Sequence, residues 1–189
     1  MNIEALVVDL SKDPFNPELN YAVAQEYDRL DQSASAVSFY LRTAEYGQDK
    51  HQPLVYQSLI NVARCFDAQK DRVATVSNCL LQAVSVMPFR PEAYFFLSQF
   101  HERKGDWQEA FTWAEVGLTM AQAFRQAPFD LKGYYGDYCL KFEKAVSAYW
   151  IGRKTESLAL FNELQALDVA PEYKDAIRSN LERISDVDV

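Results

Sequence analysis

The sequence predicts an all-α protein, built as a right-handed superhelical array of about four helical hairpins with a C-terminal capping helix. Three observations indicate this fold class. Glycine is scarce, with 6 residues among 189, while residues that favour helices are abundant. Apolar residues recur with the period of a helix, and no segment shows the alternation of a half-buried strand. Small residues also recur twelve positions apart in successive segments, as repeated hairpins would require.

Start and stop signals define the predicted helices in order. An N-terminal helix of about a dozen residues is expected to stop at Asp13-Pro14. Prolines 17, 53, 91 and 171 mark the first turns of later helices, where a missing N–H does no harm. The predicted hairpins span about 17–47, 53–87, 91–121 and 134–167, and a closing helix spans about 172–184. The whole chain, 1–189, is therefore predicted to be a single repeat domain.

Four pairs of small residues are predicted to lie where the two helices of a hairpin come closest. They are Ala24/Ala36, Ala63/Thr75, Ser98/Ala110 and Ala145/Ser157. Larger side chains at these points would hold the helix backbones apart. With Gly105-Asp106-Trp107 at one turn, Asp106 as the expected N-cap of the next helix and Gly117 late in it, the pattern resembles the tetratricopeptide repeat. The first members of the pairs are 39, 35 and 47 residues apart, so the repeats are irregular and the extra residues fall chiefly in 122–133.

A narrower resemblance covers roughly residues 54–184. This region is similar to the helical repeats that follow the catalytic domain in a group of bacterial and viral family 2 glycosyltransferases. The matching positions are Leu81, Ala83, Pro88, Arg90, Glu92, Tyr94, Leu97, Gly105, Ala114, Gly117, Leu118, Asp137, Tyr138, Glu143, Ala148, Tyr149 and Gly152. Those enzymes also carry an amino-terminal nucleotide-sugar domain with an Asp-x-Asp metal motif. Here the only Asp-x-Asp is Asp186-Val187-Asp188, which is expected to be a frayed tail. The resemblance therefore implies an accessory or stand-alone helical module and gives no reason to transfer catalysis.

Charge and cysteine content indicate which classes of partner are excluded and in which cellular compartment the protein is expected. The net charge of -8 and the pI near 4.8 argue against binding to nucleic acid or to an anionic membrane surface. The apolar run near the N-terminus is too short for a signal peptide or a membrane span. Cys65, Cys79 and Cys139 are widely spaced inside apolar helical patterns, so they are expected to be buried and reduced. The expected location is the cytoplasm of a bacterium or of an infected host cell.

Enzyme chemistry has little support in the sequence. His51 and His101 lie far apart, and no zinc spacing, phosphate loop or nucleophile elbow is present. The carboxylate pairs Asp28/Asp31 and Glu143/Glu156 are expected on solvated helices or turns. We therefore expect a non-catalytic protein, with no catalytic residue, no metal and no cofactor.

The candidate site is the concave face that the first helices of the hairpins form in tetratricopeptide arrays. The predicted partner-binding residues are Tyr21, Gln25, Asn61, Arg64, Phe95, Gln99, Glu102 and Arg103, with Asp28, Gln57, Phe142, Val146 and Tyr149 on the same face. Aromatic and arginine side chains supply much of the energy of protein interfaces, and amides pair with peptide backbones. The predicted function is a protein interaction or scaffold module that binds a partner peptide or helix. Two alternatives stay open: an accessory part of a glycosyltransferase system, with a catalytic glycosyltransferase chain as partner, and a self-associating structural protein of a viral particle.

One further segment has two interpretations. Between Phe124 and Tyr138 the chain carries five aromatic residues around Pro128 and two glycines. Exposed aromatics with polar neighbours would suit a sugar-binding platform. The favoured interpretation is that this loop folds back and fills the gap left by the irregular repeat spacing.

Overall fold

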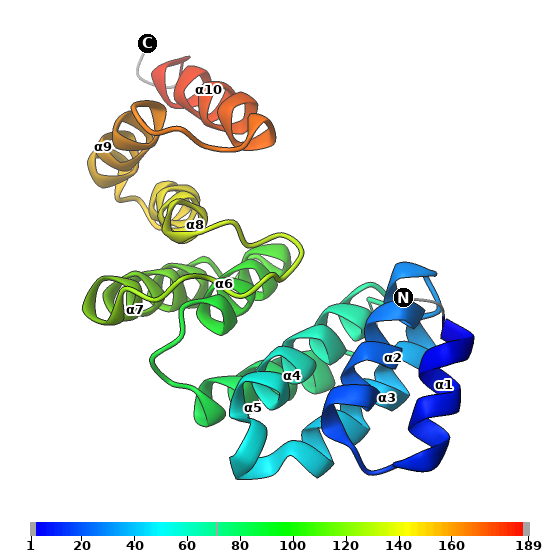
Figure 1. The fold of residues 1–189 in the computed structure, drawn as a ribbon. Helices are drawn as coiled ribbons and strands as arrows, with labels where there is room; N and C mark the ends of the chain where they lie inside the picture. The colour runs from blue at the N-terminus through cyan, green and yellow to red at the C-terminus, as the bar shows by residue number, and fades with distance from the viewer. Residues whose placement is uncertain (1–2, 71, 187–189) are drawn as a thin grey trace. The chain divides into compact units, whose positions relative to one another are not determined.

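The computed structural model describes residues 3–70 and 72–186, and its regular structure is helical (Figure 1). The helices are α1 (Ile3–Lys12), α2 (Pro17–Arg29), α3 (Ser33–Gly47), the short 3-10 helix η1 (Gln48–His51), α4 (Gln52–Asp67), α5 (Val73–Val86), α6 (Glu92–Lys104), α7 (Trp107–Phe124), α8 (Asp137–Trp150), α9 (Lys154–Gln165) and α10 (Pro171–Asp186). Within the described residues there is no strand, only an isolated bridge between Leu131 and Tyr134. The predicted all-α repeat fold is confirmed.

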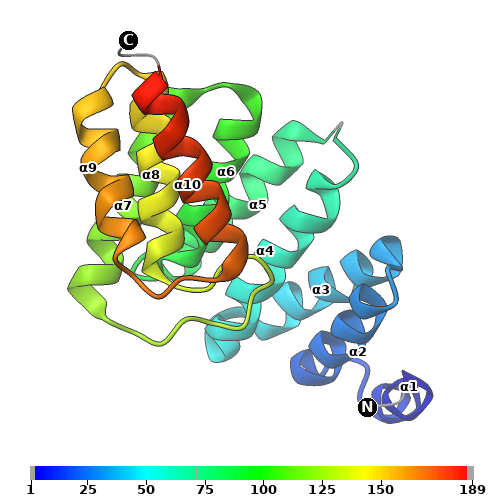
Figure 2. The same ribbon diagram turned by 90° about the horizontal axis from the view of Figure 1, so that it is seen from above.

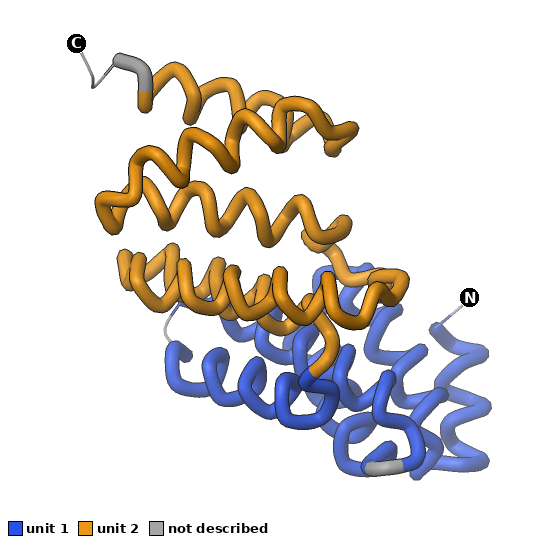
Figure 3. Tube along the Cα trace, turned by 90° about the vertical axis from the view of Figure 1, so that its left-hand side faces the viewer, with its two compact units in different colours: residues 1–88 blue, residues 89–189 orange. Residues whose placement is uncertain are grey.

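The chain divides into two compact units, residues 1–88 and 89–189, coloured separately in Figure 3. In the first unit α2 pairs with α3 and α4 with α5, and α1 packs on α2. The apolar face of α1 places Leu6 and Leu10 against Val23 of α2. That all 189 residues form a single domain therefore stays a prediction.

In the second unit α6 pairs with α7 and α8 with α9, and α10 packs on α9. Its C-terminal core joins Ala145, Phe161, Leu164, Val169 and Ile177. Helices α6, α8 and α10 are neighbours in this unit. Helix α6 contacts α8, and aromatic rings of α8 pack against Tyr173 of α10. Figure 2 shows α8 and α10 side by side. These neighbouring helices create the face on which the second unit's candidate site lies.

Seven of the eight small residues predicted at the hairpin crossings are buried, and Thr75 is half-buried. Ala24 and Ala36 are fully buried, as is Ala63 with 1% of its surface exposed. Two crossings also carry a hydrogen bond between the helices. Ser98 Oγ donates to the carbonyl of Ala110 over 2.8 Å, and Ser157 Oγ donates to that of Ala145 over 2.7 Å. A small hydroxyl therefore permits close approach and also satisfies a carbonyl of the facing helix.

Gly117 of α7 provides a close approach between α7 and the helices on either side. A Cβ at this position would lie 2.8 Å from Leu140 Cδ2 of α8 and 2.8 Å from Tyr94 Cβ of α6. We expect Gly117→Ala to lower the free energy of unfolding of the second unit by about 1–2 kcal/mol, since overpacking outweighs the better helix propensity of alanine. All three tryptophans lie at positions 107, 113 and 150, so tryptophan fluorescence in urea measures unfolding of the second unit. Exposed Thr119→Ala on the same helix should change it by less than about 0.5 kcal/mol, and equal stability of the two variants would contradict this packing argument.

A buried ion pair holds the long connection between α7 and α8 against the start of α6. Arg90 and Glu92 are 4% and 0% exposed, and the Arg90 guanidinium pairs with both carboxylate oxygens of Glu92. Arg90 also donates to Gln126 Oε1 over 2.7 Å and to the carbonyl of Ala127 over 2.9 Å. The N–H of Phe129 donates to Glu92 over 2.9 Å, and the Arg90 guanidinium lies 3.9 Å from the centre of the Phe129 ring.

The same connection then continues into the core. Leu131 and Tyr134 are 2% and 3% exposed, and the Tyr134 ring lies 5.3 Å from that of Phe95 on α6. The favoured interpretation, a loop that folds back and fills a gap, is confirmed for these residues. Tyr135 and Phe124 remain exposed.

At the turn between α6 and α7 the helix boundary lies where it is predicted, but the Asp106 side chain does not cap α7. Asp106 occupies the N-cap position of α7, but its carboxylate makes no capping hydrogen bond. It contacts Lys104 Nζ at 2.6 Å and His101 Nδ1 at 3.4 Å instead. A charged ammonium group nearby therefore competes successfully with the backbone N–H groups of the helix end. Helix α7 also runs to Phe124, beyond the expected end near 121.

Candidate binding surface

In the first unit, the predicted site residues of α2 and α4 meet along one face. Tyr21 Oη donates to Gln57 Oε1 over 3.2 Å, and Cys65 Sγ lies 4.0 Å from Asp28 Oδ1. Arg64 Nη1 donates to Asn61 Oδ1 over 2.7 Å, which orients the guanidinium. Gln25, which lies between Tyr21 and Asp28 on α2, is exposed.

Burial separates the contact residues of this face from its supports. Tyr21 and Asn61 are only 8% and 5% exposed, so a partner cannot take most of its contact area from them. Arg64 is half-buried. Behind the face, burial and then the charge of Asp28 raise the pKa of the Tyr40 phenol. The surface available to a partner in the first unit is therefore centred on Gln25 and Arg64.

In the second unit, Gln99, Glu102 and Arg103 of α6 lie beside Glu143 of α8. Gln99 Nε2 donates to Glu143 Oε1 over 3.1 Å. Burial raises the pKa of Glu143 well above its ordinary range, and the neighbouring carboxyl group of Glu102 raises it further. The hydrogen bond from Gln99 and the charge of Arg103 oppose this shift. Gln99 and Glu102 are half-buried and Arg103 is exposed.

Two expectations for this face are wrong. Phe95 is 0% exposed, because Tyr134 and Phe96 pack on its ring, so it belongs to the core and cannot contact a partner. Glu143 is 3% exposed, whereas a carboxylate on a solvated helix face was expected. Glu156, the other member of that predicted pair, forms an ion pair with Lys144 at 3.1 Å. Glu143 is thus a functional candidate that the sequence argument did not select.

The three other α8 residues predicted on this face pack against the C-terminal core and do not form the binding surface. Phe142 packs edge-on against Phe161 and Tyr173, with ring centres 5.8 and 5.1 Å apart. Phe142, Val146 and Tyr149 are half-buried against the C-terminal core. Their packing fixes α8 relative to α10 and so positions Glu143.

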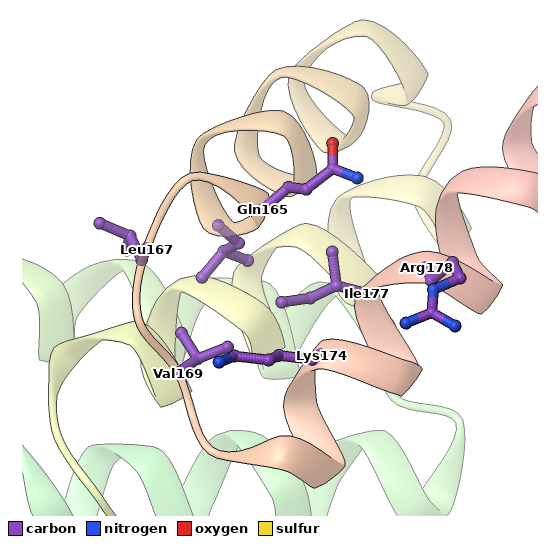
Figure 4. Close-up of a pocket in the computed structure, with 7 residues that line it drawn as sticks. Gln165, Leu167, Val169, Lys174, Ile177 and Arg178 are labelled. Carbon is purple, nitrogen blue, oxygen red and sulfur yellow. The ribbon is translucent and has the colours of Figure 1, made fainter.

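A separate pocket of about 200 Å³ lies between α9 and α10 (Figure 4). Leu164, Val169 and Ile177 are buried residues of its lining, and Lys174 and Arg178 also line it. Each of these cations has an exposed acidic neighbour, since Lys174 lies 3.1 Å from Asp168 and Arg178 lies 3.5 Å from Asp175. The pocket therefore offers an apolar recess with little net charge around it.

Each histidine lies beside a carboxylate of its own unit. His51 Nδ1 lies 3.5 Å from Glu18 in the first unit, and His101 contacts Asp106 in the second. Across the described residues, no three His, Cys, Asp or Glu side chains gather as metal ligands would. Val187 and Asp188 of the Asp-x-Asp motif lie outside the described residues. None of the described helices is both long and apolar enough to cross a membrane.

Solved structures with similar folds are tetratricopeptide-repeat (TPR) proteins. YrrB, a TPR protein with an unusual peptide-binding site, has a TM-score of 0.66 and 11% identity over 88% of this chain and 76% of its own. A putative kinesin light chain from Podosopora anserina, with nearly identical TPR-like repeats, has a TM-score of 0.64 and 19% identity over 92% and 88%. BtubC from P. vanneervenii has a TM-score of 0.73 and 12% identity over 96% and 78%.

These likenesses show that the chain has the tetratricopeptide-repeat fold. Identities below 20% carry no information on a shared ligand. Comparison of the sequence with models of protein families and with curated proteins found no match.

Proposed function

We propose that the protein is a non-catalytic interaction module that binds a partner peptide or helix on the face made by the first helices of its hairpins. The observation that carries this proposal is the polar surface of Gln99, Glu102 and Arg103, held over a buried carboxyl group by the hydrogen bond from Gln99 to Glu143. Amide and charged groups that are fixed in place lose little side-chain entropy when a partner binds. In the first unit Arg64 is fixed in the same way by Asn61.

The fold supports a protein as the ligand. Within each unit the first helices of the two hairpins contact each other, and adjacent helix faces of this kind suit an extended peptide or an amphipathic helix. YrrB is a TPR protein with a peptide-binding site, so this fold is compatible with such a ligand. The eight residues predicted to bind it now divide into contacts (Gln25, Arg64, Gln99, Glu102, Arg103) and supports (Tyr21, Asn61, Phe95).

Selection from a displayed library of random peptides tests the proposal. We expect the full chain to enrich peptides whose affinity, measured by fluorescence anisotropy, falls at least about tenfold in Arg64→Glu or in Gln99→Ala combined with Arg103→Glu, because interface arginines and oriented amides carry much of the binding energy. Matched controls on second helices are Arg42→Glu of α3 and Gln82→Ala of α5, both at exposed positions, which should leave the affinity within twofold.

The two units are tested separately by these variants. Loss of binding in only one of them assigns the peptide to that unit. Peptides that bind all the variants equally would place the site elsewhere, and failure to enrich any peptide would contradict the proposed function.

The narrower predictions stay predictions. A catalytic glycosyltransferase chain as partner and self-association in a viral particle remain alternative proposals. Several positions matched to the glycosyltransferase repeats, including Arg90, Glu92 and Gly117, serve packing in this structure. We therefore propose no glycosyltransferase activity from these positions.

A further inference from the structure

The buried carboxyl group of Glu143 has one oxygen whose hydrogen bonding is incomplete. Its Oε1 accepts from Gln99, while no donor among the described residues reaches Oε2. A buried carboxylate oxygen without a donor costs about 1–3 kcal/mol or more. Glu102, one helical turn beyond Gln99 on α6, brings a second carboxyl group to the same place.

The titratable groups around Glu143 do not neutralise the charge that two ionised carboxyl groups would carry. Helix α6 contributes Glu102 and Arg103, α8 itself contributes the Cys139 thiol, and α10 contributes the Tyr173 phenol. Burial raises the pKa values of the Cys139 thiol and the Tyr173 phenol, so both stay neutral at physiological pH. With both carboxyls ionised, the two acids and Arg103 would leave one net negative charge, part of it buried. In the free protein a proton on Glu143 removes that charge.

We infer that the Glu102–Glu143 carboxyl pair is a binding site for a cationic side chain of the partner, a lysine or an arginine. A guanidinium or ammonium group carries the N–H donors that Oε2 lacks and the charge that the ionised pair requires. Because Oε2 is buried, the proposal requires the half-buried Gln99 and Glu102 side chains to turn outward when the cation binds. The amide oxygen of Gln99 is a further acceptor of the same site. The chain's net charge of -8 favours encounter with basic partners. The identity of the ligand as part of a partner protein rests on the proposed function, whereas the cation site itself does not.

The exchange of a proton for a cation makes binding dependent on pH. At a pH below the raised pKa of free Glu143, the bound cation displaces about one proton into solution, so affinity rises with pH by up to about tenfold per unit. Above that pKa the free site is already ionised, and affinity no longer changes with pH. The Arg103 charge remains in both states.

A pair of small probes tests the site without any knowledge of the partner. N-acetyl-arginine amide is titrated into the isotope-labelled full chain, with N-acetyl-citrulline amide as the uncharged probe of the same shape. We expect saturable NMR shifts of the Gln99 side-chain amide with the arginine probe only, and binding at least about tenfold weaker in Glu102→Gln and in Glu143→Gln. Glutamine resembles the neutral acid, so both variants should fold, which circular dichroism checks. Glu163→Gln removes an exposed carboxylate of α9 and should bind the probe as the unaltered chain does.

The outcomes separate this inference from the proposed function. Equal shifts with citrulline, no shifts with either probe, or full binding in both glutamine variants would overturn the cation site, in which case the carboxyl pair binds only a proton. Selected peptides that bind this face without any basic residue would also overturn it, while leaving the proposed function intact. Saturable binding of the arginine probe without any enriched peptide would support the cation site and contradict the proposed function.

Discussion

Replacing Glu92 with glutamine is expected to lower the free energy of unfolding of the second unit by about 3–5 kcal/mol. The change leaves the Arg90 guanidinium buried without its counter-charge, which is the costly way to break a buried ion pair. It also weakens the hydrogen bond that the Phe129 N–H donates to the carboxylate. The connection from α7 to α8 should therefore loosen together with the start of α6.

Urea unfolding followed by tryptophan fluorescence measures this loss, because every tryptophan lies in the second unit. Glu163→Gln is a matched control, since its ion pair with Lys141 at 2.8 Å is on the surface. We expect that control to change stability by less than about 1 kcal/mol. If Glu92→Gln cost no more than Glu163→Gln, the buried pair would have no part in fixing the connection.

Phe95→Ala is expected to destabilise the second unit by a similar amount, about 3–5 kcal/mol, because it leaves a cavity in a fully buried site. The rings of Phe96 and Tyr134, at 5.1 and 5.3 Å, would lose their common neighbour. The same fluorescence measurement applies. Phe89→Ala, at a residue 52% exposed, should cost less than about 1 kcal/mol.

Phe95→Ala also distinguishes between a Phe95 side chain on the binding face and one in the core. A side chain on the binding face would change peptide affinity and leave stability almost unaltered. A core side chain does the reverse, as long as the measurement is made where the variant is folded. Little loss of stability in Phe95→Ala would mean that Phe95 is not the core residue that the structure places against Tyr134.

Local signals explain why so much of the fold was predictable. Prolines at helix starts and small residues twelve positions apart act within one hairpin, and the bonds Ser98–Ala110 and Ser157–Ala145 follow directly from that spacing. The burial of Phe95 depends on Tyr134, 39 positions further along the chain, through a loop whose path no local rule specifies. That distance explains why a position on the expected inner face was assigned to the surface.

Glu143 was missed for a different reason. A signal was present, because Glu143 lies in the same helical stripe as Leu140 and Ser147, both of which are buried. Glutamate is almost never fully buried without a partner. The prediction therefore placed Glu143 on the surface because of its residue type, although its position in the helix favoured burial. Arg90 and Glu92 offered no comparable signal, since the backbone and side chains that satisfy them come from residues 126–129.

Each unit contains at least one buried cysteine whose rate of alkylation can report local unfolding of that unit. Cys65 and Cys79 lie in the first unit and Cys139 in the second, and all three are reduced and buried. Burial raises the pKa of Cys65 to about 11 and also raises the pKa values of Cys79 and Cys139, so few thiolates are present even when a reagent is near. Alkylation of these thiols therefore requires local unfolding that separates a pair of helices. The rate at which each thiol is modified then reports how often its own unit opens, independently of the other.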